Sequence, residues 1–439
     1  MLNKRTLFFY AKLNMGEKHM QKDHRMLLGV DEKPNFWPGL LLSFQHVFSM
    51  FGATILVPII LGLPVSVALL MSGIGTLIYH YVTQSKVPVY LGSSFAFIGA
   101  MQIAIDQFEG DISASQSGII ISGLTYIIIA LLSKKVGTKW LDKIMPPIVI
   151  GPMIVVIGLG LSGTAVENAD LVIGGQWQNV IVAIVTFLIV AYVNTKATGF
   201  LKIIPFLAGI VGGYIAGLIL GIVDISPILE ADWFSLPELY LPFETSLFKH
   251  YDLYFGPESW AFLPLVLVTV AEHVGDHTVL GTMTNRNYLK DPGLSRTLSG
   301  DGLASLVSAF FGGPANTTYG ENTGVIGLTR IASVSVIRNA AIIAILLSFF
   351  GKFTALLTTI PNAVIGGMSI VLYGVIASNG LKVMIDEQLD FTKARNLIIA
   401  SSMLVIGLGG AVLDMGPLVI SGTALSALVG IILNLILSN

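Results

Sequence analysis

Long apolar runs separated by short polar stretches make up most of the chain from Pro38 onwards. An α-helix needs about 20 apolar residues to cross the hydrocarbon core of a bilayer. The pattern therefore predicts a polytopic helical membrane protein. The apolar candidates, some of them short for a full span, are 38–61, 64–83, 117–133, 147–163, 178–195, 202–222, 259–281, 299–312, 332–351, 363–381, 394–414 and 417–437.

Two further apolar segments are short and interrupted by glycine, namely VYLGSSFAFIGAMQIAI (89–105) and NTTYGENTGVIGLT (316–329). We interpret each as a broken membrane crossing that contains a half-helix. The β-prone VPVY and the NTTY suggest a short extended strand that leads into a half-helix, and the two strands could pair near the midplane. The half-helix N-termini, near Ser94–Phe95 and Gly320–Glu321, would then offer free backbone N–H groups and the positive end of the helix dipole.

Counting both broken crossings gives an all-α protein of fourteen transmembrane segments. The broken segment is third in each set of seven, and an odd number of crossings inverts the second set relative to the first. Paired broken segments in inverted halves are typical of a transporter's substrate site. We therefore expect a leader (1–37), a first repeat (38–222), an acidic loop (223–258) and a second repeat (259–439).

Composition agrees with this class. The 439 residues are 54% hydrophobic and 11% charged, whereas soluble domains carry about 25% charged residues. The absence of cysteine excludes disulfides and thiolate metal sites, and a net charge of −2 gives no indication of nucleic-acid binding. The leader is polar and basic without a signal-peptide core, and Met15, Met20 and Met26 offer alternative start sites within it.

The distribution of lysine and arginine predicts the orientation. Basic residues accumulate on the cytoplasmic side of a membrane protein. With the N-terminus inside, the 223–258 loop falls outside, and this loop holds seven acidic residues but only one lysine, Lys249. Both termini are then cytoplasmic, and Lys352 is the main exception. The basic residues that fall inside are Lys86, Lys134, Lys135, Lys139, Lys143, Lys196, Lys202, Arg286, Lys290, Arg296, Arg330, Arg338, Lys393 and Arg395.

The sequence AEHVGDH, residues 271–277, brings two acids and two histidines into an apolar span. Glu272 and Asp276 are spaced i, i+4 and share one helix face, and His273 and His277 form a second stripe. An ionised group at the bilayer centre costs a few kcal/mol, so such groups face a cavity or a partner. Because burial disfavours a charged carboxyl group, Glu272 is a candidate proton carrier. We expect the histidines to be packed or hydrogen-bonded, since no third metal ligand is evident.

Glu321 is another acid predicted at membrane depth, in TTYGENTGV where a half-helix should begin. A glutamate there could simply complement the helix dipole. The cluster of Tyr, Gly, Glu and Asn favours a binding role, with Asn322 tying loop backbone together. Two carboxylates facing one cavity suit a neutral ligand with several N–H donors, and the half-helix N–H groups suit its carbonyl oxygens. With Phe95 as a flat wall, such a site would fit a pyrimidinedione or an oxopurine.

Several longer motifs carry a family resemblance. QHVFSMFGATILVP, YLGSSFAFI, AEHVGD, DPGLSR, NTTYGENTGV and IPNAVIGGMSIVLYGVIASNG together resemble the nucleobase–ascorbate transporter family, in its bacterial uracil permease branch. The likeness runs from about Pro38 to the C-terminus. It implies a fourteen-helix inverted-repeat fold with core and gate domains, and proton-coupled uracil import by alternating access without a cofactor or bound metal. It also implies a bacterial plasma-membrane protein, with a homodimer formed through the gate domains.

The resemblance also assigns site residues. It implies that Glu272 and Glu321 hydrogen-bond the ring, surrounded by Ala53, Ser94, Phe95, Tyr319 and Gly320, with Tyr373 as a candidate supporting residue. Purine-specific relatives usually carry glutamine in place of Glu321, which favours uracil. The uracil permease pattern has histidine where this chain has Asp276, and aspartate there is familiar from purine transporters. Either Asp276 or His277 could take over as the proton relay.

Three alternatives remain beside uracil:proton symport. The first is the same fold carrying xanthine, urate or another purine, to which Asp276 points. The second is a sulfate or bicarbonate transporter of related fold, against which two ligand-facing acids argue. The third is a channel or membrane enzyme, but the sequence has no continuous polar pore, nucleophile–base set or metal cluster to support it.

Overall fold

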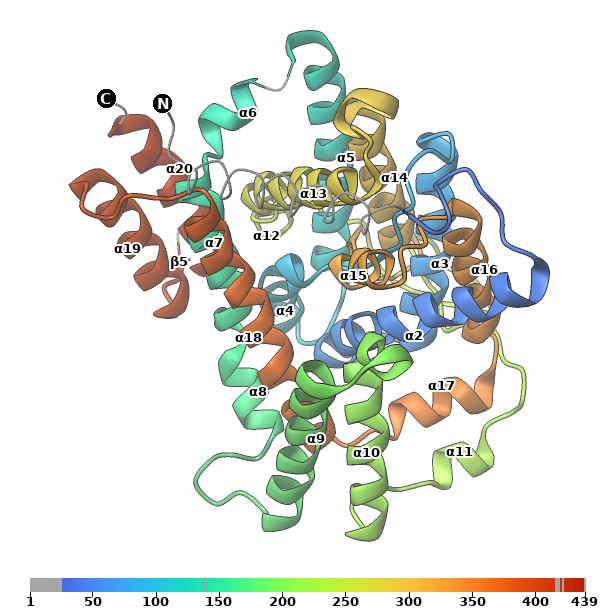
Figure 1. Ribbon diagram of the computed structural model, residues 1–439. Helices are drawn as coiled ribbons and strands as arrows, with labels where there is room; N and C mark the ends of the chain where they lie inside the picture. The colour runs from blue at the N-terminus through green and yellow to red at the C-terminus, as the bar shows by residue number, and fades with distance from the viewer. Residues whose placement is uncertain (1–25, 138, 415–418, 421, 438–439) are drawn as a thin grey trace, which may run out of the picture.

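The apolar runs of the sequence form the helices of a mostly helical chain (Figure 1). The computed structural model describes residues 26–437 apart from 138, 415–418 and 421. The elements of the first half are α2 (Phe36–Leu61), α3 (Val65–Val82), β1 (Leu91–Ser93), the 3₁₀ turn η1 (Phe95–Phe97), α4 (Ile98–Gln107), α5 (Ser113–Val136), α6 (Lys139–Ile144), α7 (Pro147–Gly160), α8 (Ser162–Asn168), α9 (Trp177–Lys196), the 3₁₀ turn η2 (Gly199–Ile203) and α10 (Pro205–Ile219).

The second half begins with a long connection and again places a short strand, β4, before a half-helix among long helices. Its elements are α11 (Ser226–Glu230), β2 (Tyr240–Leu241), β3 (Lys249–His250), α12 (Pro257–Trp260), α13 (Leu263–Thr284), the π turn η3 (Leu289–Gly293), α14 (Leu294–Phe310), β4 (Asn316–Thr318), α15 (Gly320–Thr329), α16 (Val334–Ser348), α17 (Gly351–Thr358), α18 (Asn362–Asp386), α19 (Ala394–Leu408), β5 (Leu413–Asp414), β6 (Val419–Ile420) and α20 (Gly422–Ile436).

Six helical segments within the described residues are long and apolar enough to cross a membrane, and a seventh results if the bent pair α16–α17 counts as one span. The six are α2, α3, α5, α7 with α8, α9 and α18. Helices α10, α19 and α20 are apolar but shorter. Helix α13 has 22 residues, but its Glu272–His277 stretch makes it too polar for this set. The protein is therefore a multi-pass membrane protein.

The two predicted strands form and pair. Strand β1 runs antiparallel to β4, with Leu91 opposite Thr318 and Ser93 opposite Asn316. The second strand falls within NTTY as predicted, whereas the first begins just after VPVY rather than within it. Pro88 has no N–H to donate to a ladder, which explains the later start. One more bond, from Tyr319 N to Tyr90 O at 3.0 Å, extends the ladder.

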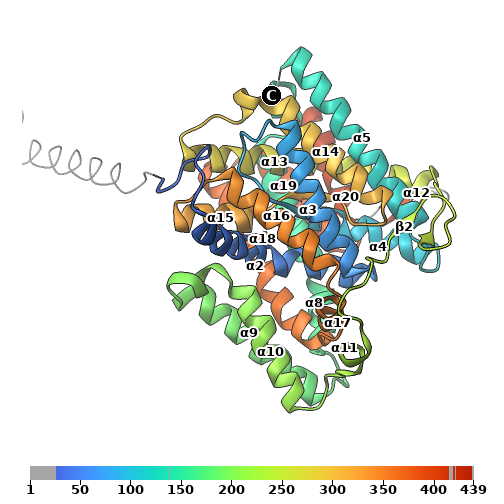
Figure 2. The same ribbon diagram turned by 90° about the vertical axis from the view of Figure 1, so that its right-hand side faces the viewer.

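Close helix contacts are made at glycine. Helix α5 packs on α14, and α3 packs on α16. A Cβ on Gly302 would lie 2.7 Å from Gly123 O, and one on Gly73 would lie 2.5 Å from Ala341 O. Small residues let helix backbones approach in a membrane protein. Both views show α9 and α10 on the opposite side of α2 from α5 and α14 (Figures 1 and 2).

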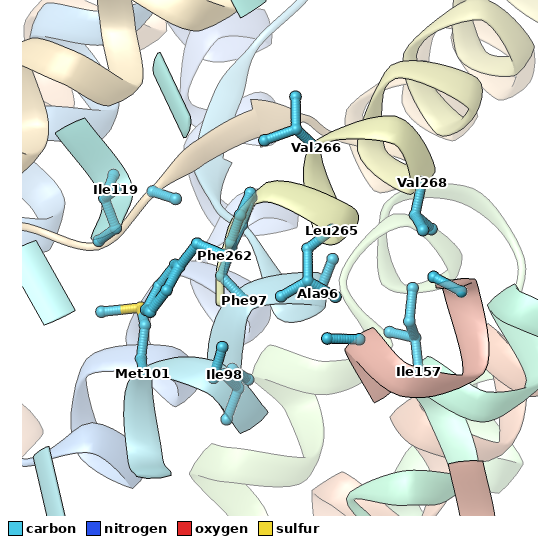
Figure 3. Close-up of a cluster of buried hydrophobic side chains, with 14 of the residues drawn as sticks. Ala96, Phe97, Ile98, Met101, Ile119, Ile157, Phe262, Leu265, Val266 and Val268 are labelled. Carbon is cyan, nitrogen blue, oxygen red and sulfur yellow. The ribbon is translucent and has the colours of Figure 1, made fainter. Parts of the chain in front are cut away.

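Two large apolar clusters flank the strand pair. One joins the first half-helix to α5 and the start of α13, with the rings of Phe97 and Phe262 stacked at a centroid distance of 6.1 Å (Figure 3). The other joins α2 and α18 and contains Ala53, Tyr319 and Tyr373. The first cluster therefore packs the first half-helix, and the second packs Tyr319 at the start of the second half-helix.

Residues 26–33, here called the N-terminal strap, add an extended segment beside the α15–α16 junction. Leu27 N donates to Arg330 O at 2.7 Å, Ala332 N to Leu28 O at 2.9 Å, and Val334 N to Val30 O at 3.1 Å. Asp31 pairs with Arg286, which follows α13, at 2.5 Å. Although its charges are exposed, the strap buries Val30 and so joins the ends of α13 and α15.

The 223–258 loop packs onto the helices. Tyr251 donates to Ala309 O on α14 at 3.0 Å. Lys352 donates to the carbonyl oxygens of Ile228 and Leu229 in α11, at 2.7 and 2.8 Å. A cation that satisfies helix carbonyls has a local electrostatic role, which accounts for the position of Lys352 as an exception in the charge pattern.

Candidate functional site

The two half-helices begin at the paired strands, as the sequence predicts. Ser94 and Tyr319 precede them as N-cap residues, both in extended conformation, and neither side chain caps its helix. The first-turn N–H groups of a helix have no intrahelical acceptor. Antiparallel pairing therefore brings two sets of free N–H donors, with the positive ends of two helix dipoles, to one region.

Helix α13 passes this region and contacts η1, β4 and α15. Its acid-bearing face contains Glu272 and Asp276, both half-buried. Thr318, the last residue of β4, donates from Oγ1 to Asp276 Oδ2 at 2.6 Å. The carboxyl groups of Asp276 and Glu321 lie within electrostatic range of Glu272. The structure thus brings the three predicted acids together at the strand crossing.

The apolar part of the site comes from three elements. Phe95, at the start of η1, meets Tyr373 of α18 edge-to-face, with ring centroids 6.3 Å apart. Ala53 of α2 belongs to the same buried cluster. Ser94 Oγ and Tyr373 Oη are buried and have no hydrogen-bond partner among the described residues. Buried hydroxyls without partners can donate to or accept from a bound polar molecule.

Tyr319 contributes its backbone rather than its phenol to this region. The hydroxyl donates to Ser93 O at 3.1 Å and accepts from Thr54 Oγ1 at 3.1 Å. The ring lies over the partner strand, where a Cβ on Gly92 would be 2.3 Å from Tyr319 Cζ. The side chain therefore fastens the strand pair, and Gly320, which is exposed, begins the half-helix.

Asn322 ties the second half-helix to α2. Its amide nitrogen donates to His46 O at 3.0 Å and lies 3.2 Å from His46 Nδ1. Asn322 therefore bonds to the backbone of a neighbouring helix rather than to loop backbone.

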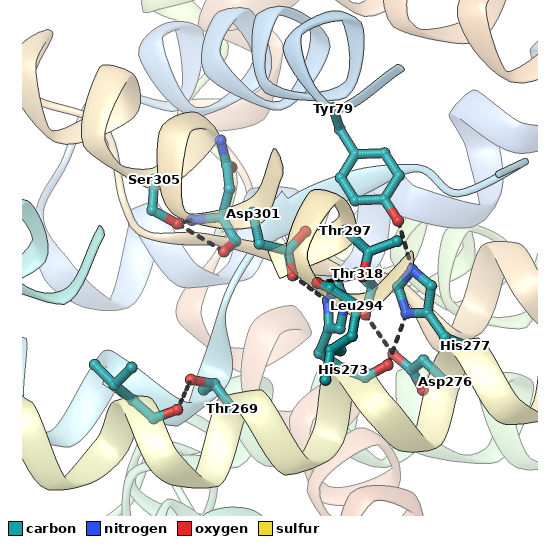
Figure 4. A network of polar contacts seen from close by, with 12 residues as sticks. Tyr79, Thr269, His273, Asp276, His277, Leu294, Thr297, Asp301, Ser305 and Thr318 are labelled. Carbon is teal, nitrogen blue, oxygen red and sulfur yellow. Dashed lines mark hydrogen bonds and ion pairs between the residues drawn. The ribbon is translucent and has the colours of Figure 1, made fainter. Parts of the chain in front are cut away.

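A buried polar network lies behind the acid-bearing face (Figure 4). His273 Nδ1 is 2.7 Å from Asp301 Oδ2, and both side chains are fully buried. His277 Nδ1 donates to His273 O at 2.7 Å, and Tyr79 bonds to its Nε2 at 2.5 Å. The histidines are stacked with centroids 3.9 Å apart. The network links α3, α13 and α14. Its hydrogen bonds fix the rotation of α13 about its own helix axis.

The sequence analysis missed Asp301, Tyr79 and Thr318. Asp301 carries the same signal that identifies Glu272, an acid inside a predicted span, 299–312. Tyr79 and Thr318 carry no such signal, because neither tyrosine nor threonine is costly to bury when its hydroxyl is bonded.

Glu321 also lines a cavity of about 160 Å³ whose lining includes no residue of the strand pair. Helix α2, the η2–α10 segment and α15 form its walls. The lining residues are Phe48, Ser49, Lys202, Ile203, Ile204, Pro205, Phe206, Leu207, Glu321, Gly324, Val325 and Leu328.

Comparison with known proteins gives consistent matches. A model of the permease family matches residues 39–416. The uracil permease of Bacillus caldolyticus is 45% identical over 421 residues, covering 94% of this chain and 95% of its own. That of Bacillus subtilis (strain 168) is 45% identical, covering 93% and 95%, and that of Escherichia coli (strain K12) is 41% identical, covering 94% of both.

Solved structures share the fold at low identity. The transmembrane domain of the cyanobacterium bicarbonate transporter BicA aligns with a TM-score of 0.58 at 16% identity, covering 92% of this chain and 98% of that one. Murine Slc26a9, an anion transporter in the inward-facing state, aligns with a TM-score of 0.65 at 12% identity, covering 92% and 69%.

Proposed function

The chain belongs to the nucleobase–ascorbate transporter family of permeases, on the side of the bacterial uracil permeases, and from this membership we propose that it imports uracil together with a proton. The observation that carries the proposal is the meeting of Glu272, Asp276 and Glu321 with two free half-helix N-termini at one strand pair. The proposed substrate, uracil, is taken from the names of the relatives.

The proposed binding mode follows from hydrogen-bonding capacity. Uracil has two N–H donors and two carbonyl acceptors. The carboxylates of Glu272 and Glu321 accept from the ring N–H groups, and backbone N–H groups after Ser94 and Tyr319 donate to the carbonyl oxygens. Phe95, Tyr373 and Ala53 enclose the ring faces, which agrees with their shared cluster. This mode uses every site residue expected from the sequence except Asp276, Asn322 and His277, and Asn322 acts as a support.

The proposed architecture is fourteen segments in two inverted repeats, 38–222 and 259–439, joined by the 223–258 loop. The repeat relation supports it, because α5 packs on α14 as α16 packs on α3, each pair meeting at a glycine. Segments around the strand pair form the core in this proposal, and α7–α10 with α18–α20 form the gate. Alternating access is relative movement of the two, and a homodimer would form through the gate helices.

Proton coupling is assigned to Glu272 and Asp276. A proton that neutralises one of two acids beside the ligand changes ligand affinity, and by linkage the ligand changes proton affinity equally. Thr318 can donate to an ionised Asp276 or accept from a protonated one, so the bond survives either state. His277 is the second candidate relay, although both of its ring nitrogens are already bonded.

The proposed location is the plasma membrane with both termini cytoplasmic, from the distribution of lysine and arginine. A purine substrate is the second candidate function, and Asp276 is the observation that favours it. Three acids at the site argue against an anion substrate, although the fold is shared with anion transporters.

The test is uptake of radiolabelled uracil by permease-deficient cells that express the wild type, Glu321→Gln or Glu244→Gln. Glu244 is an exposed loop residue and serves as the matched control. Loss of a charged hydrogen bond should reduce uptake by Glu321→Gln about 10- to 100-fold. A protonophore should abolish wild-type uptake, and xanthine should not compete.

Surface expression without uracil uptake, or strong competition by xanthine, would contradict the uracil assignment and favour the purine alternative. Uptake that persists unchanged with a protonophore would contradict the proton coupling alone.

A further inference from the structure

The cavity beside Glu321 is distinct from the enclosure around Phe95. The residues that line the cavity do not include Glu272 or Tyr373. Glu321 is the residue that the cavity shares with the proposed binding site. Phe206 forms part of its wall and packs on α2, where a Cβ on Gly52 would lie 2.9 Å from Phe206 Cβ. Gly52 immediately precedes Ala53 on α2.

The cavity has the size of a single six-membered ring. Its volume is about 160 Å³, and an apolar protein cavity of roughly 150 Å³ accepts benzene. The walls that face each other come from different parts of the molecule. Helices α2 and α15 hold one side, and the η2–α10 segment holds the other.

The lining is chemically suited to a nucleobase. Its charged or hydroxyl-bearing side chains are Ser49, Lys202 and Glu321, and Phe48 and Phe206 add two aromatic rings. A carboxylate only accepts hydrogen bonds, an ammonium only donates, and a hydroxyl does both. Adjacent N–H and C=O groups on a planar ring match this set, and the rings of Phe48 and Phe206 offer flat apolar contact.

Lys202 is exposed and reaches the cavity from the η2 turn. It does not form an ion pair with Glu321 across the cavity. The Lys202 ammonium can therefore donate a hydrogen bond to a ligand whose N–H group is bound by the Glu321 carboxylate.

We propose that this cavity is a second, transient nucleobase subsite on the cytoplasmic release path, with Lys202 as its carbonyl ligand. The proposal rests on the proposed function and its orientation. Uracil leaving Glu272 keeps its bond to Glu321, passes Phe206 and exchanges backbone donors for the Lys202 ammonium. Glu321 is the shared ligand of both positions, and Lys202 acts in release rather than in primary binding.

The first experiment compares Lys202→Met, Lys202→Arg and Lys196→Met in proteoliposomes. Lys196 is an exposed lysine at the end of α9, in the same basic connection but outside the cavity lining. Counterflow of radiolabelled uracil should be about tenfold slower for Lys202→Met, as expected for a lost charged hydrogen bond. Lys202→Arg and Lys196→Met should keep counterflow within about twofold of the wild type. Equilibrium uracil binding should stay within about twofold in all three.

The second experiment uses the absence of native cysteine. Leu328→Cys lines the cavity, and Leu201→Cys is comparably exposed, at 53% against 51%, but lies outside the lining. Saturating uracil should slow maleimide labelling at 328 and leave labelling at 201 unchanged. This measurement keeps the proposal testable if Lys202→Met folds poorly.

Counterflow by Lys202→Met equal to that of Lys196→Met, or labelling at 328 that uracil does not slow, would overturn the subsite while wild-type binding stands. Absence of uracil binding by the wild type would instead overturn the proposed function, and the subsite with it.

Discussion

Asp276 is oriented by a residue of the strand pair rather than by its own helix. Thr318 holds its Oδ2 at 2.6 Å and belongs to β4, two residues before the second half-helix. A change of charge or position at Asp276 therefore acts directly on β4, the strand that leads into the half-helix carrying Glu321. The hydroxyl of Thr318 acts as a positioning group between the proposed proton site and the proposed ligand site.

Thr318→Val should reduce uracil uptake about tenfold, because valine keeps the shape but leaves the half-buried Asp276 carboxyl group without its donor. Thr318→Ser should retain most of the activity. Thr317→Val is the matched control, since the Thr317 hydroxyl is buried without a hydrogen-bond partner among the described residues. The measurement is initial uptake rate normalised to surface expression. Equal loss in Thr317→Val and Thr318→Val would attribute the effect to strand packing.

For single residues, the sequence identifies charged side chains at membrane depth better than the residues to which they hydrogen-bond. The membrane cost of ionised groups makes Glu272 and Glu321 visible, and the same rule applied to Asp301 would have found it. The partners His273–Asp301 and Asp276–Thr318 are 28 and 42 residues apart. Only the fold determines such pairs, so no local pattern predicts them.

The helix crossings depend on glycine at matching places in the two halves. Gly123 and Gly302 meet where α5 crosses α14, with each glycine's Cβ position 2.7 Å from the other's carbonyl oxygen. Because both obstacles are backbone atoms, no rotamer change relieves the contact. The crossing sets the position of α14, and with it Asp301 and the His273 end of the buried network.

Gly302→Ala should destabilise the protein by about 1–3 kcal/mol, the usual cost of overpacking. Gly163→Ala in α8 is the control, because a Cβ there has no atom within 4 Å. Replacing a helical glycine by alanine is otherwise favourable by about 0.5–1 kcal/mol, so the control should melt at the same or a higher temperature. Thermal melting in detergent measures both. A Gly302→Ala variant as stable as the control would contradict the close crossing.

Elements were predicted well where their pattern is unusual and less well at their boundaries. Two Gly-interrupted apolar segments in corresponding places predicted the half-helices and their strands, since regular spans lack such breaks. The bend of 84° between α16 and α17 was not predicted. The predicted span 332–351 ends at the bend, and neither proline nor a change of composition indicates that a further apolar helix, α17, follows at an angle.

For the whole molecule, charge and hydropathy together predict how the chain lies in the bilayer. The apolar pattern predicts the number of crossings, and the basic loops predict their direction.

The orientation predicts the labelling of single cysteines in a chain that has none of its own. Ser246→Cys, exposed in the acidic loop, should react with a membrane-impermeant maleimide on intact cells. Asn287→Cys, exposed beyond α13, should react only after permeabilisation. The reverse pattern would invert the proposed topology, and labelling of both in intact cells would contradict the number of crossings between them.

The N-terminal strap is part of the folded structure around the candidate site. It lies between the ends of the two elements that carry Glu272 and Glu321, although it precedes the first apolar residue of α2. Trimming the polar leader up to Met26 would leave each of these bonds in place. Trimming to the first predicted span at Pro38 would remove them all, so the described fold extends at least about a dozen residues before the boundary that hydropathy suggests.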